Sequence, residues 1–304
     1  MIDNTRNKDN TKIGVIGLGL MGSGFLRRLH GEGWHVAGWN RSRAVTLPLR
    51  EYGFAIEDTL ASLVRSSNVL LSSLANDDAV RELYFGEDGV FESLQPGTTI
   101  LEMSTISTGL SAQLHQEALM LGVEMMDLPV SGSTPAVNAG TVTLFAGGEP
   151  ATFERCIPIF ESIARQWYLM GPATAGVRMK LVANLLLGVT MEAIAEAVSL
   201  GEHLKLNRDL LLEVLPKTAV IAPAFLGKFP KMKEGDYSPQ FPLYLMSKDL
   251  NLVDDAADLS GAMLPATSAT KQIFADALAG KGQLDLSAVT TYVQTLAPGE
   301  IRVA

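Results

Sequence analysis

A glycine-rich pattern near the start of the chain constrains its fold more than any other feature. Gly17, Gly19 and Gly22 form a G-x-G-x-x-G pattern that follows an apolar run and precedes a helix-like segment. In a strand–turn–helix unit the first glycine permits a tight turn, the second lets a pyrophosphate approach the backbone, and the third allows close helix–strand packing. The phosphates then lie at the positive N-terminus of the helix. The residues predicted to contact a dinucleotide here are Gly17, Leu18, Gly19, Leu20, Met21 and Gly22.

Apolar, β-rich runs alternate with helix-length segments through the first half of the chain. Expected strands lie within residues 12–19, 34–40, 67–75, 98–104, 123–130 and 142–148. Strands separated by helices imply a parallel sheet with crossover helices. The predicted fold class is therefore α/β, with a Rossmann-type, doubly wound, mostly parallel sheet followed by an all-helical C-terminal domain.

The pattern changes after Gly171-Pro172, where long helical runs begin to dominate. The segment from about Ala175 to Leu204 contains no proline, and a helix of this length would be roughly 45 Å long. We expect it to join two domains. The predicted parts are a flexible tail (1–11), a dinucleotide-binding Rossmann domain (12–171) and a helical substrate and oligomerisation domain (172–304).

Neither the polar start of the chain nor its most apolar stretch indicates a secretory signal or a membrane span. The first ten residues are polar and lack the apolar core of a secretory signal. The apolar stretch from Leu181 to Leu200 contains Asn184, Glu192 and Glu196, which makes insertion into a bilayer costly and favours a buried soluble helix. The single cysteine excludes an intrachain disulfide and fits a reducing, cytoplasmic compartment.

The second expected strand indicates which dinucleotide binds. An NAD site usually places an acidic residue there to hold the ribose 2′-hydroxyl, whereas this chain has Asn40, Arg41 and Ser42. A carboxylate would repel a 2′-phosphate, but Arg41 can pair with it and its neighbours can donate hydrogen bonds. The alternative is that Arg41 is an ordinary surface arginine. NADPH is the predicted cofactor.

Charge and histidine spacing exclude other classes of partner. The formal net charge is -9, so no overall basic field exists to hold nucleic acid. The four histidines show no metal-ligand spacing, and no zinc pattern is present. No metal is predicted.

Two further motifs carry a family resemblance. The first runs from Asp127 to Ser133 as D-L-P-V-S-G-S and is followed by Gly140-Thr141 and Gly147-Gly148. The second is the G-x-x-x-K-x-x-x-N pattern within residues 176–184. Together with the glycine-rich turn, they closely resemble the β-hydroxyacid dehydrogenase family, which includes 3-hydroxyisobutyrate dehydrogenase and glyoxylate/succinic semialdehyde reductase.

The second motif has a geometric rationale of its own. Gly176, Lys180 and Asn184 are spaced four residues apart and share one face of a helix. Glycine is expected to leave room for a ligand beside the backbone. Lys180 can donate a proton to the alkoxide as hydride reaches a carbonyl carbon, provided that burial or a nearby cation depresses its pKa. Asn184 can orient the lysine or the substrate hydroxyl. The alternative is a surface lysine beside a polar helix residue.

The remaining candidate residues follow expected strand ends or come from the resemblance. Ser131, Gly132 and Ser133 follow a strand end, where a hydroxyl and backbone N–H groups can hold a carboxylate. An ordinary strand-exit turn is the alternative. The resemblance implies that Ser131 and Gly132 bind the substrate's acid group and that Lys248 comes near cofactor and substrate, although Lys248-Asp249 could equally be a surface ion pair. It also implies a nicotinamide-side contact at Thr105.

One more expected strand end completes the predicted cofactor cleft, and differences in sequence among family members indicate the substrate. Leu74 and Ala75 are expected to line the cleft through backbone atoms. Arg41, Ser131–Ser133 and the Phe241-Pro242-Leu243 segment look closest to glyoxylate/succinic semialdehyde reductases, which implies reduction of a small anionic aldehyde acid to its hydroxy acid. Leu128, where relatives often carry alanine, is expected to alter the pocket.

Other functions remain open at this point. A 3-hydroxyisobutyrate or tartronate-semialdehyde dehydrogenase is the nearest alternative. An imine reductase shares the fold, but Lys180 counts against it, since those enzymes typically lack the lysine. A cofactor-binding protein without turnover is the third possibility. The resemblance further implies that the long helix packs against another subunit in a homodimer or homotetramer.

Overall fold

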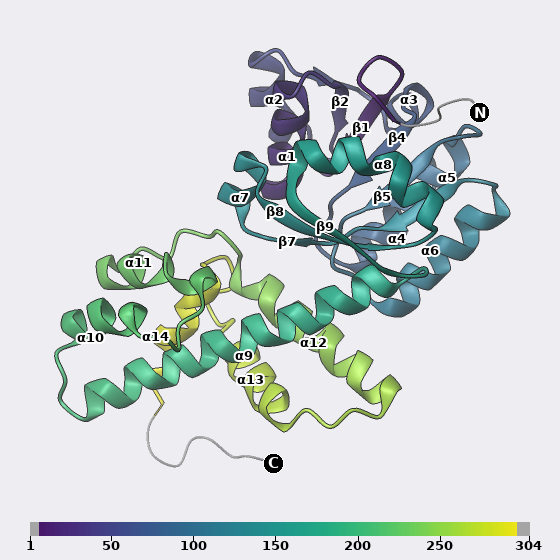
Figure 1. Ribbon diagram of the computed structural model, residues 1–304. Coiled ribbons are helices and arrows are strands. Elements are labelled where there is room, and N and C mark those ends of the chain that lie inside the picture. The colour runs from purple at the N-terminus through teal and green to yellow at the C-terminus, as the bar shows by residue number, and fades with distance from the viewer. Residues whose placement is uncertain (1–5, 297–304) are drawn as a thin grey trace. The chain divides into compact units, whose positions relative to one another are not determined.

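The computed structural model describes residues 6–296, and the chain divides into two compact units between Leu181 and Val182. The division falls inside one continuous helix, α9 (Ala175–His203), which confirms the long helix expected there. The N-terminal unit (residues 1–181) holds the sheet, and the C-terminal unit (182–304) is helical (Figure 1).

The described part of the N-terminal unit contains one nine-stranded sheet. Its order is β3-β2-β1-β4-β5-β6-β8-β7, and β9 pairs with β8. The strands are β1 (Lys12–Ile16), β2 (His35–Trp39), β3 (Ala55–Ile56), β4 (Val69–Ser72), β5 (Thr99–Glu102), β6 (Glu124–Asp127), β7 (Val130–Ser131), β8 (Val142–Gly147) and β9 (Ala164–Gly171). All pairs are parallel except β6–β8 and β7–β8. This arrangement confirms the predicted doubly wound, mostly parallel sheet.

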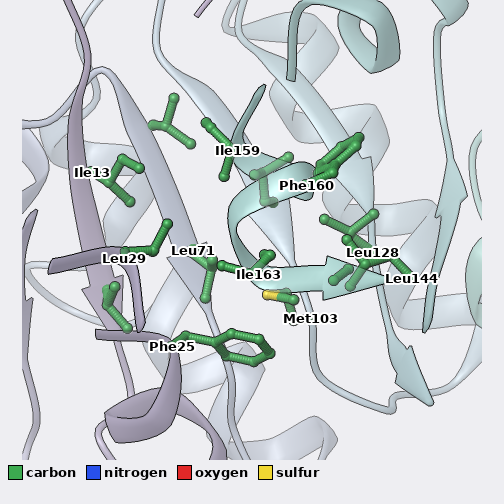
Figure 2. Packing of buried hydrophobic residues seen from close by; sticks show 14 of the residues in the cluster. Ile13, Phe25, Leu29, Leu71, Met103, Leu128, Leu144, Ile159, Phe160 and Ile163 are labelled. Atoms are coloured by element: carbon green, nitrogen blue, oxygen red, sulfur yellow. The ribbon is translucent and has the colours of Figure 1, made fainter. Parts of the chain in front are cut away.

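Helices cover both faces of the sheet, which is why β4 and β5 at its centre are buried along their whole length. The helices of this unit are α1 (Leu20–Gly31), α2 (Arg43–Glu51), α3 (Leu60–Ser66), α4 (Asp77–Phe85), α5 (Val90–Ser93), α6 (Thr108–Met120), α7 (Thr134–Ala139) and α8 (Pro150–Ile163). Helices α7 and α8 pack beside α1, while α3, α4 and α6 pack with α5 or each other. Figure 2 shows Phe25 and Leu29 of α1 and Ile163 of α8 around Leu71 of β4 in the buried core.

Two details of the sheet differ from the sequence prediction. The expected strand at 123–130 is two strands, β6 and β7, because Pro129 between them has no N–H group to donate to a neighbour. Strand β9 was not predicted. It follows α8 without an intervening turn, and most of its side chains are at least partly exposed, so it lacks the buried apolar pattern of the central strands.

The segment before β1 was predicted as part of a flexible tail. Residues 1–5 lie outside the described part of the chain. Arg6 donates a hydrogen bond from its backbone to Arg155 O at 3.1 Å and from its side chain to Gly97 O at 2.9 Å. Thr11 is buried. Residues 6–11 are therefore attached to the N-terminal unit.

The C-terminal unit has its own apolar core, which includes Met191, Ile194, Phe229, Met246 and Phe274. Besides its share of α9, the unit contains α10 (Arg208–Val214), α11 (Lys228–Glu234), α12 (Leu243–Ser260), α13 (Pro265–Asp276), α14 (Val289–Val293) and short 3-10 helices at Leu215–Lys217, Pro223–Phe225 and Leu286–Ala288. The described residues of this unit form no strand, as predicted.

Helix α9 is long and apolar enough to cross a membrane by length and composition, a test that core helices of soluble proteins also meet. Asn184 on this helix is 2% exposed and donates from Nδ2 to Asp249 Oδ2 at 2.5 Å. This polar contact is buried within the C-terminal unit, where each of the two side chains satisfies the other.

Glu192 and Glu196, one turn apart on α9, make stability depend on pH. Burial, followed by the charge of and hydrogen bond with Glu196, raises the pKa of Glu192 to about 7. A carboxyl with a raised folded-state pKa contributes stability below its unfolded value of 4.5, and this contribution is lost as pH rises through about 7. We expect Glu192→Gln to raise Tm relative to the unchanged protein at pH 8 and to lose most of that advantage near pH 5.

Thermal unfolding followed by circular dichroism at the two pH values measures this difference. Partial exposure of Glu192 limits the shift to a few degrees, roughly. The exposed Glu161 on α8 offers a control, since Glu161→Gln should shift Tm equally at both pH values. A Glu192→Gln shift that is the same at pH 5 and pH 8 would contradict the prediction.

Candidate active site

The glycine-rich turn leaves open space beside one of its three glycines. Gly17 has a φ of 85°, and a Cβ there would lie 2.4 Å from Ser73 O. A Cβ on Gly22 would lie 1.9 Å from Gly17 O, so both positions require glycine for the turn itself. A Cβ on Gly19 would meet nothing within 4 Å. The turn therefore closes tightly at both ends and leaves backbone accessible at Gly19, which fits a bound pyrophosphate.

The N-terminus of α1 is suited to an anion. Gly19 is its N-cap residue, no side chain among the described residues caps it, and its first turn has no acidic residue. Backbone N–H groups and the positive end of the helix dipole therefore face outward without a competing carboxylate. The residues present fit a dinucleotide.

In the segment after β2, Asn40 hydrogen-bonds to the glycine-rich turn, whereas Arg41 is exposed to solvent. Asn40 accepts a hydrogen bond from Leu18 N at 2.9 Å and donates from Nδ2 to Ser42 O at 3.0 Å. Its amide thus holds the glycine-rich turn, in addition to the phosphate contact predicted for it. Arg41 is exposed and forms an ion pair with Glu82 of α4. Its guanidinium can exchange this exposed partner for a phosphate at little cost.

The loops that follow β4 and β5 are tied together by hydrogen bonds. Leu74 N donates to Ser104 Oγ at 2.8 Å, and Ser104 N donates to Glu102 Oε1 at 2.8 Å. Ala75 is exposed and Thr105 is half-buried at the same edge. Thr105, predicted to contact the nicotinamide, and Leu74 and Ala75, predicted to line the cofactor cleft, therefore lie on two loops that a hydrogen bond joins.

The same hydrogen bonds involve a carboxylate that the sequence did not indicate. Glu102 is fully buried beside Ser72 and Tyr84. Burial raises its pKa, and hydrogen bonds from Ser104 and Ser72 only partly oppose this. Its position at the end of a buried strand was the one available signal, because a carboxylate there needs buried partners.

The predicted carboxylate-binding segment begins at Ser131, the last residue of β7, and continues through Gly132 and Ser133. Ser131 is half-buried and Gly132 has a φ of 153°, which favours glycine. A Cβ on Gly132 would lie 2.8 Å from a side-chain carbon of Val142. Ser133 is the N-cap of α7 and makes no cap hydrogen bond through its side chain. The segment presents hydroxyl groups and a glycine backbone. Leu128, which was expected to alter the pocket, is fully buried in the core instead.

The start of α9 places Lys180 about one turn after the helix begins, where it is half-buried. The expectation that Gly176 leaves room for a ligand is wrong. A Cβ there would lie 2.3 Å from Phe145 O and 2.9 Å from Asp127 Oδ2, so the glycine lets the helix pack directly against the sheet.

In the C-terminal unit the structure brings Asn184 and Lys248 to one buried carboxylate. Asp249 on α12 is 1% exposed, accepts from Asn184, and has Oδ1 2.7 Å from Lys248 Nζ. Lys248 and Asp249 therefore do form the ion pair left open by the sequence, but its carboxylate is buried and its ammonium group is only partly exposed. Asp249 is also a residue whose link to Asn184 the sequence reasoning missed, since 65 residues separate them.

The structure gathers the N-terminal candidates at one edge of the sheet. The carboxyl ends of parallel strands meet at one edge, and residues 17–22, 40–42, 74–75 and Thr105 follow β1, β2, β4 and β5 in turn. Ser131 comes soon after β6. A polar cavity of about 480 Å³ lined by Lys12, Asn68 and Thr98 lies at the start of the strands and contains none of the predicted site residues.

Two family profiles match nearly the whole chain. Residues 12–171 match the NAD binding domain of 6-phosphogluconate dehydrogenase, and residues 174–293 match a domain described as NAD-binding of NADP-dependent 3-hydroxyisobutyrate dehydrogenase. With the Rossmann sheet and its glycine-rich turn, these matches define an oxidoreductase that uses a nicotinamide dinucleotide.

Individual relatives agree with that class. Glyoxylate/succinic semialdehyde reductase 1 of Arabidopsis thaliana is 30% identical over 93% of this chain and 98% of its own length. The 2-(hydroxymethyl)glutarate dehydrogenase of Eubacterium barkeri is 33% identical over 91% of this chain and 93% of its own length. A 3-hydroxyisobutyrate dehydrogenase structure from Salmonella typhimurium superposes with a TM-score of 0.86 at 29% identity, covering 93% and 100% of the two chains. The chain belongs to the β-hydroxyacid dehydrogenase family, as its motifs indicated.

Proposed function

We propose that this enzyme reduces a small aldehyde acid, glyoxylate or succinic semialdehyde, to its hydroxy acid with NADPH. The observation that carries the proposal is the 30% identity with a glyoxylate/succinic semialdehyde reductase over almost the full length of both chains. The carboxylate-binding segment at 131–133 and Lys180 supply the two groups that such a reaction needs.

Each residue has a defined part in this scheme. Bound NADPH supplies a hydride to the carbonyl carbon. The Lys180 ammonium donates a proton to the carbonyl oxygen as negative charge develops there. Ser131 Oγ and the backbone N–H groups of Gly132 and Ser133 bind the substrate carboxylate. Asn184 and Lys248 remain predicted contributors, both supported by Asp249.

A spectrophotometric screen tests the proposal. NADPH and NADH oxidation are followed with glyoxylate and succinic semialdehyde, and NADP⁺ reduction with 3-hydroxyisobutyrate and 2-(hydroxymethyl)glutarate. We expect the highest kcat/KM for an aldehyde acid with NADPH. An uncharged aldehyde of the same chain length is the control and should react poorly, because it has no carboxylate for residues 131–133 to bind.

Oxidation of a hydroxy acid is the second candidate, favoured by the likeness to 3-hydroxyisobutyrate dehydrogenase and 2-(hydroxymethyl)glutarate dehydrogenase. The same screen separates the two, since higher kcat/KM for a hydroxy acid would replace the aldehyde acid as substrate. No turnover with any compound would favour a binding protein.

Replacing Arg41 tests the choice of cofactor. We expect Arg41→Ala to weaken NADPH binding about tenfold or more, because a charge-assisted contact with the 2′-phosphate is lost, and to leave NADH binding nearly unchanged. Fluorescence titration of both cofactors measures the effect. Glu82→Gln is the matched control: it removes the partner of Arg41 in the unliganded chain and should tighten NADPH binding. Equal losses for both cofactors would show that Arg41 does not contact the 2′-phosphate.

We also propose that the enzyme is a cytoplasmic homodimer or homotetramer. Val182, Leu186 and Leu200 on α9 are more than half exposed in the single chain, which leaves apolar surface for a second subunit. Cys156 is buried, so its thiol is not accessible for a disulfide with another chain. This is consistent with a protein of the reducing cytoplasm.

A further inference from the structure

A buried carboxylate holds the first turn of α9. Asp127, at the end of β6, is 0% exposed. Its Oδ1 accepts a hydrogen bond from Thr174 N at 2.8 Å, and its Oδ2 accepts one from Val177 N at 2.7 Å. Helices leave their first N–H groups without an intrahelical partner, and a negative charge there is stabilised by the helix dipole. Asp127 thus acts as a cap supplied from a distant strand.

A third contact fixes the carboxylate from the other side. His115 on α6 places Nε2 2.9 Å from Asp127 Oδ1. Both oxygens therefore have partners, as a fully buried charge requires. The carboxylate connects α6, β6 and α9 within the N-terminal unit.

Two glycines make the space that this carboxylate occupies. A Cβ on Gly147 would lie 2.4 Å from Asp127 Oδ1 and 2.7 Å from Ala175 N. A Cβ on Gly176 would lie 2.9 Å from Asp127 Oδ2. Since real Cβ atoms do not approach so closely, any other residue at either position would displace the carboxylate or the helix.

The residue at the start of the helix is strained. Thr174 has a φ of 74°, which is unusual for a β-branched side chain, and its buried Oγ1 has no hydrogen-bond partner among the described residues. Such strain persists only where surrounding contacts impose it, and it often marks functional positions. The hydrogen bond from Thr174 N to Asp127 is one of the contacts that hold this residue.

We propose that Asp127 is a positioning residue for Lys180. Lys180 follows Val177 by three residues, so it lies on the turn that directly follows the one Asp127 holds. A change in the first turn would move the ammonium group, and a displacement of about 1 Å can lower a rate about 100-fold. This inference rests on the proposed role of Lys180 as proton donor.

Asp127→Asn tests the proposal with almost no change in shape. Its amide oxygen can keep one helix N–H bond, but its NH₂ group must face the other N–H. We expect kcat to fall about 10- to 100-fold, the KM for NADPH to change less than about threefold, and the pH profile of kcat to shift because Lys180 sits in altered surroundings. A purely structural role would leave the pH profile of the folded fraction unchanged.

Ser162→Ala is the matched control in the same unit. It removes the buried hydrogen bond from Trp34 Nε1 to Ser162 Oγ at 2.8 Å and touches neither α9 nor the candidate site. We expect this control to lose stability and keep its kcat and pH profile. All variants are assayed at a temperature where circular dichroism shows them folded.

The outcomes separate this inference from the proposed function. Unchanged kcat in Lys180→Ala overturns the role of Lys180 and the present inference with it. If Lys180→Ala is inactive but Asp127→Asn keeps the kcat and pH profile of the unchanged enzyme, only the positioning role is overturned. If Asp127→Asn does not fold, Asp127→Ser decides, since its single hydroxyl oxygen cannot replace the two carboxylate oxygens that accept from Thr174 N and Val177 N. A reduced kcat with a shifted pH profile supports the proposal. An unchanged kcat with an unchanged pH profile overturns it.

Discussion

Lys180→Ala is expected to lower kcat by at least about two orders of magnitude, in line with the loss of general acid–base catalysis. The Rossmann sheet and glycine-rich turn do not depend on this side chain, so NADPH binding should persist. Steady-state kinetics with the best aldehyde acid gives kcat, and fluorescence titration gives the Kd for NADPH. The combination of lost turnover and retained binding would identify Lys180 as a group that acts on the reacting atoms.

Arg178→Ala provides the matched control for this variant. Arg178 is an exposed cation two residues before Lys180, and residues two apart do not share a helix face. Its removal changes the net charge by the same amount and should leave kcat within about a factor of two or three. Equal activity of Lys180→Ala and Arg178→Ala would remove the lysine from the mechanism.

Loss of the buried Lys228–Asp285 ion pair is expected to have the largest effect on stability. Lys228 Nζ lies 2.9 and 2.8 Å from the two Asp285 oxygens, and the lysine and aspartate are 8% and 2% exposed. Asp285 also accepts from the backbone N–H groups of Gln240 and Ser287. Removing one partner leaves an uncompensated buried charge, so Lys228→Ala should lower the free energy of unfolding by about 3–5 kcal/mol.

Urea unfolding of the purified enzyme measures this loss. Lys217→Ala removes an exposed pair with Glu213 and is the control, with an expected loss of stability far smaller than that of Lys228→Ala. Similar midpoints for the two variants would mean that the buried pair adds nothing to stability.

The same aspartate gives the stability a dependence on acid. Burial acts to raise the pKa of Asp285, but the hydrogen bond from and charge of Lys228, with further hydrogen bonds, outweigh it and lower the pKa below 3.8. A lowered folded-state pKa contributes stability above the unfolded value, and this is lost as pH falls through the folded-state value. The difference between Asp285→Asn and the unchanged protein should therefore shrink in strong acid.

Local patterns were enough to predict the dinucleotide turn and α9, because the spacing of the three glycines and the absence of proline are read within a few turns of chain. The limits appear where distant residues meet. Gly176 was expected to leave room for a ligand, because no residue near it in the sequence indicates that Asp127 fills that space. Asp249 as the partner of Asn184 was missed for the same reason, and β9 because partly exposed strands carry weak hydropathy patterns.

The crowded corner formed by Asp127, Gly147 and Gly176 constrains how the enzyme can be altered. Gly147 and Gly176 cannot be replaced singly without strain, because a methyl group added at either glycine takes space that the Asp127 carboxylate already fills. Libraries intended to change substrate preference should therefore randomise Ser131 and Ser133 and keep this corner constant. A variant that does change this corner should combine two substitutions, a smaller side chain at position 127 and a larger one at position 147 or 176.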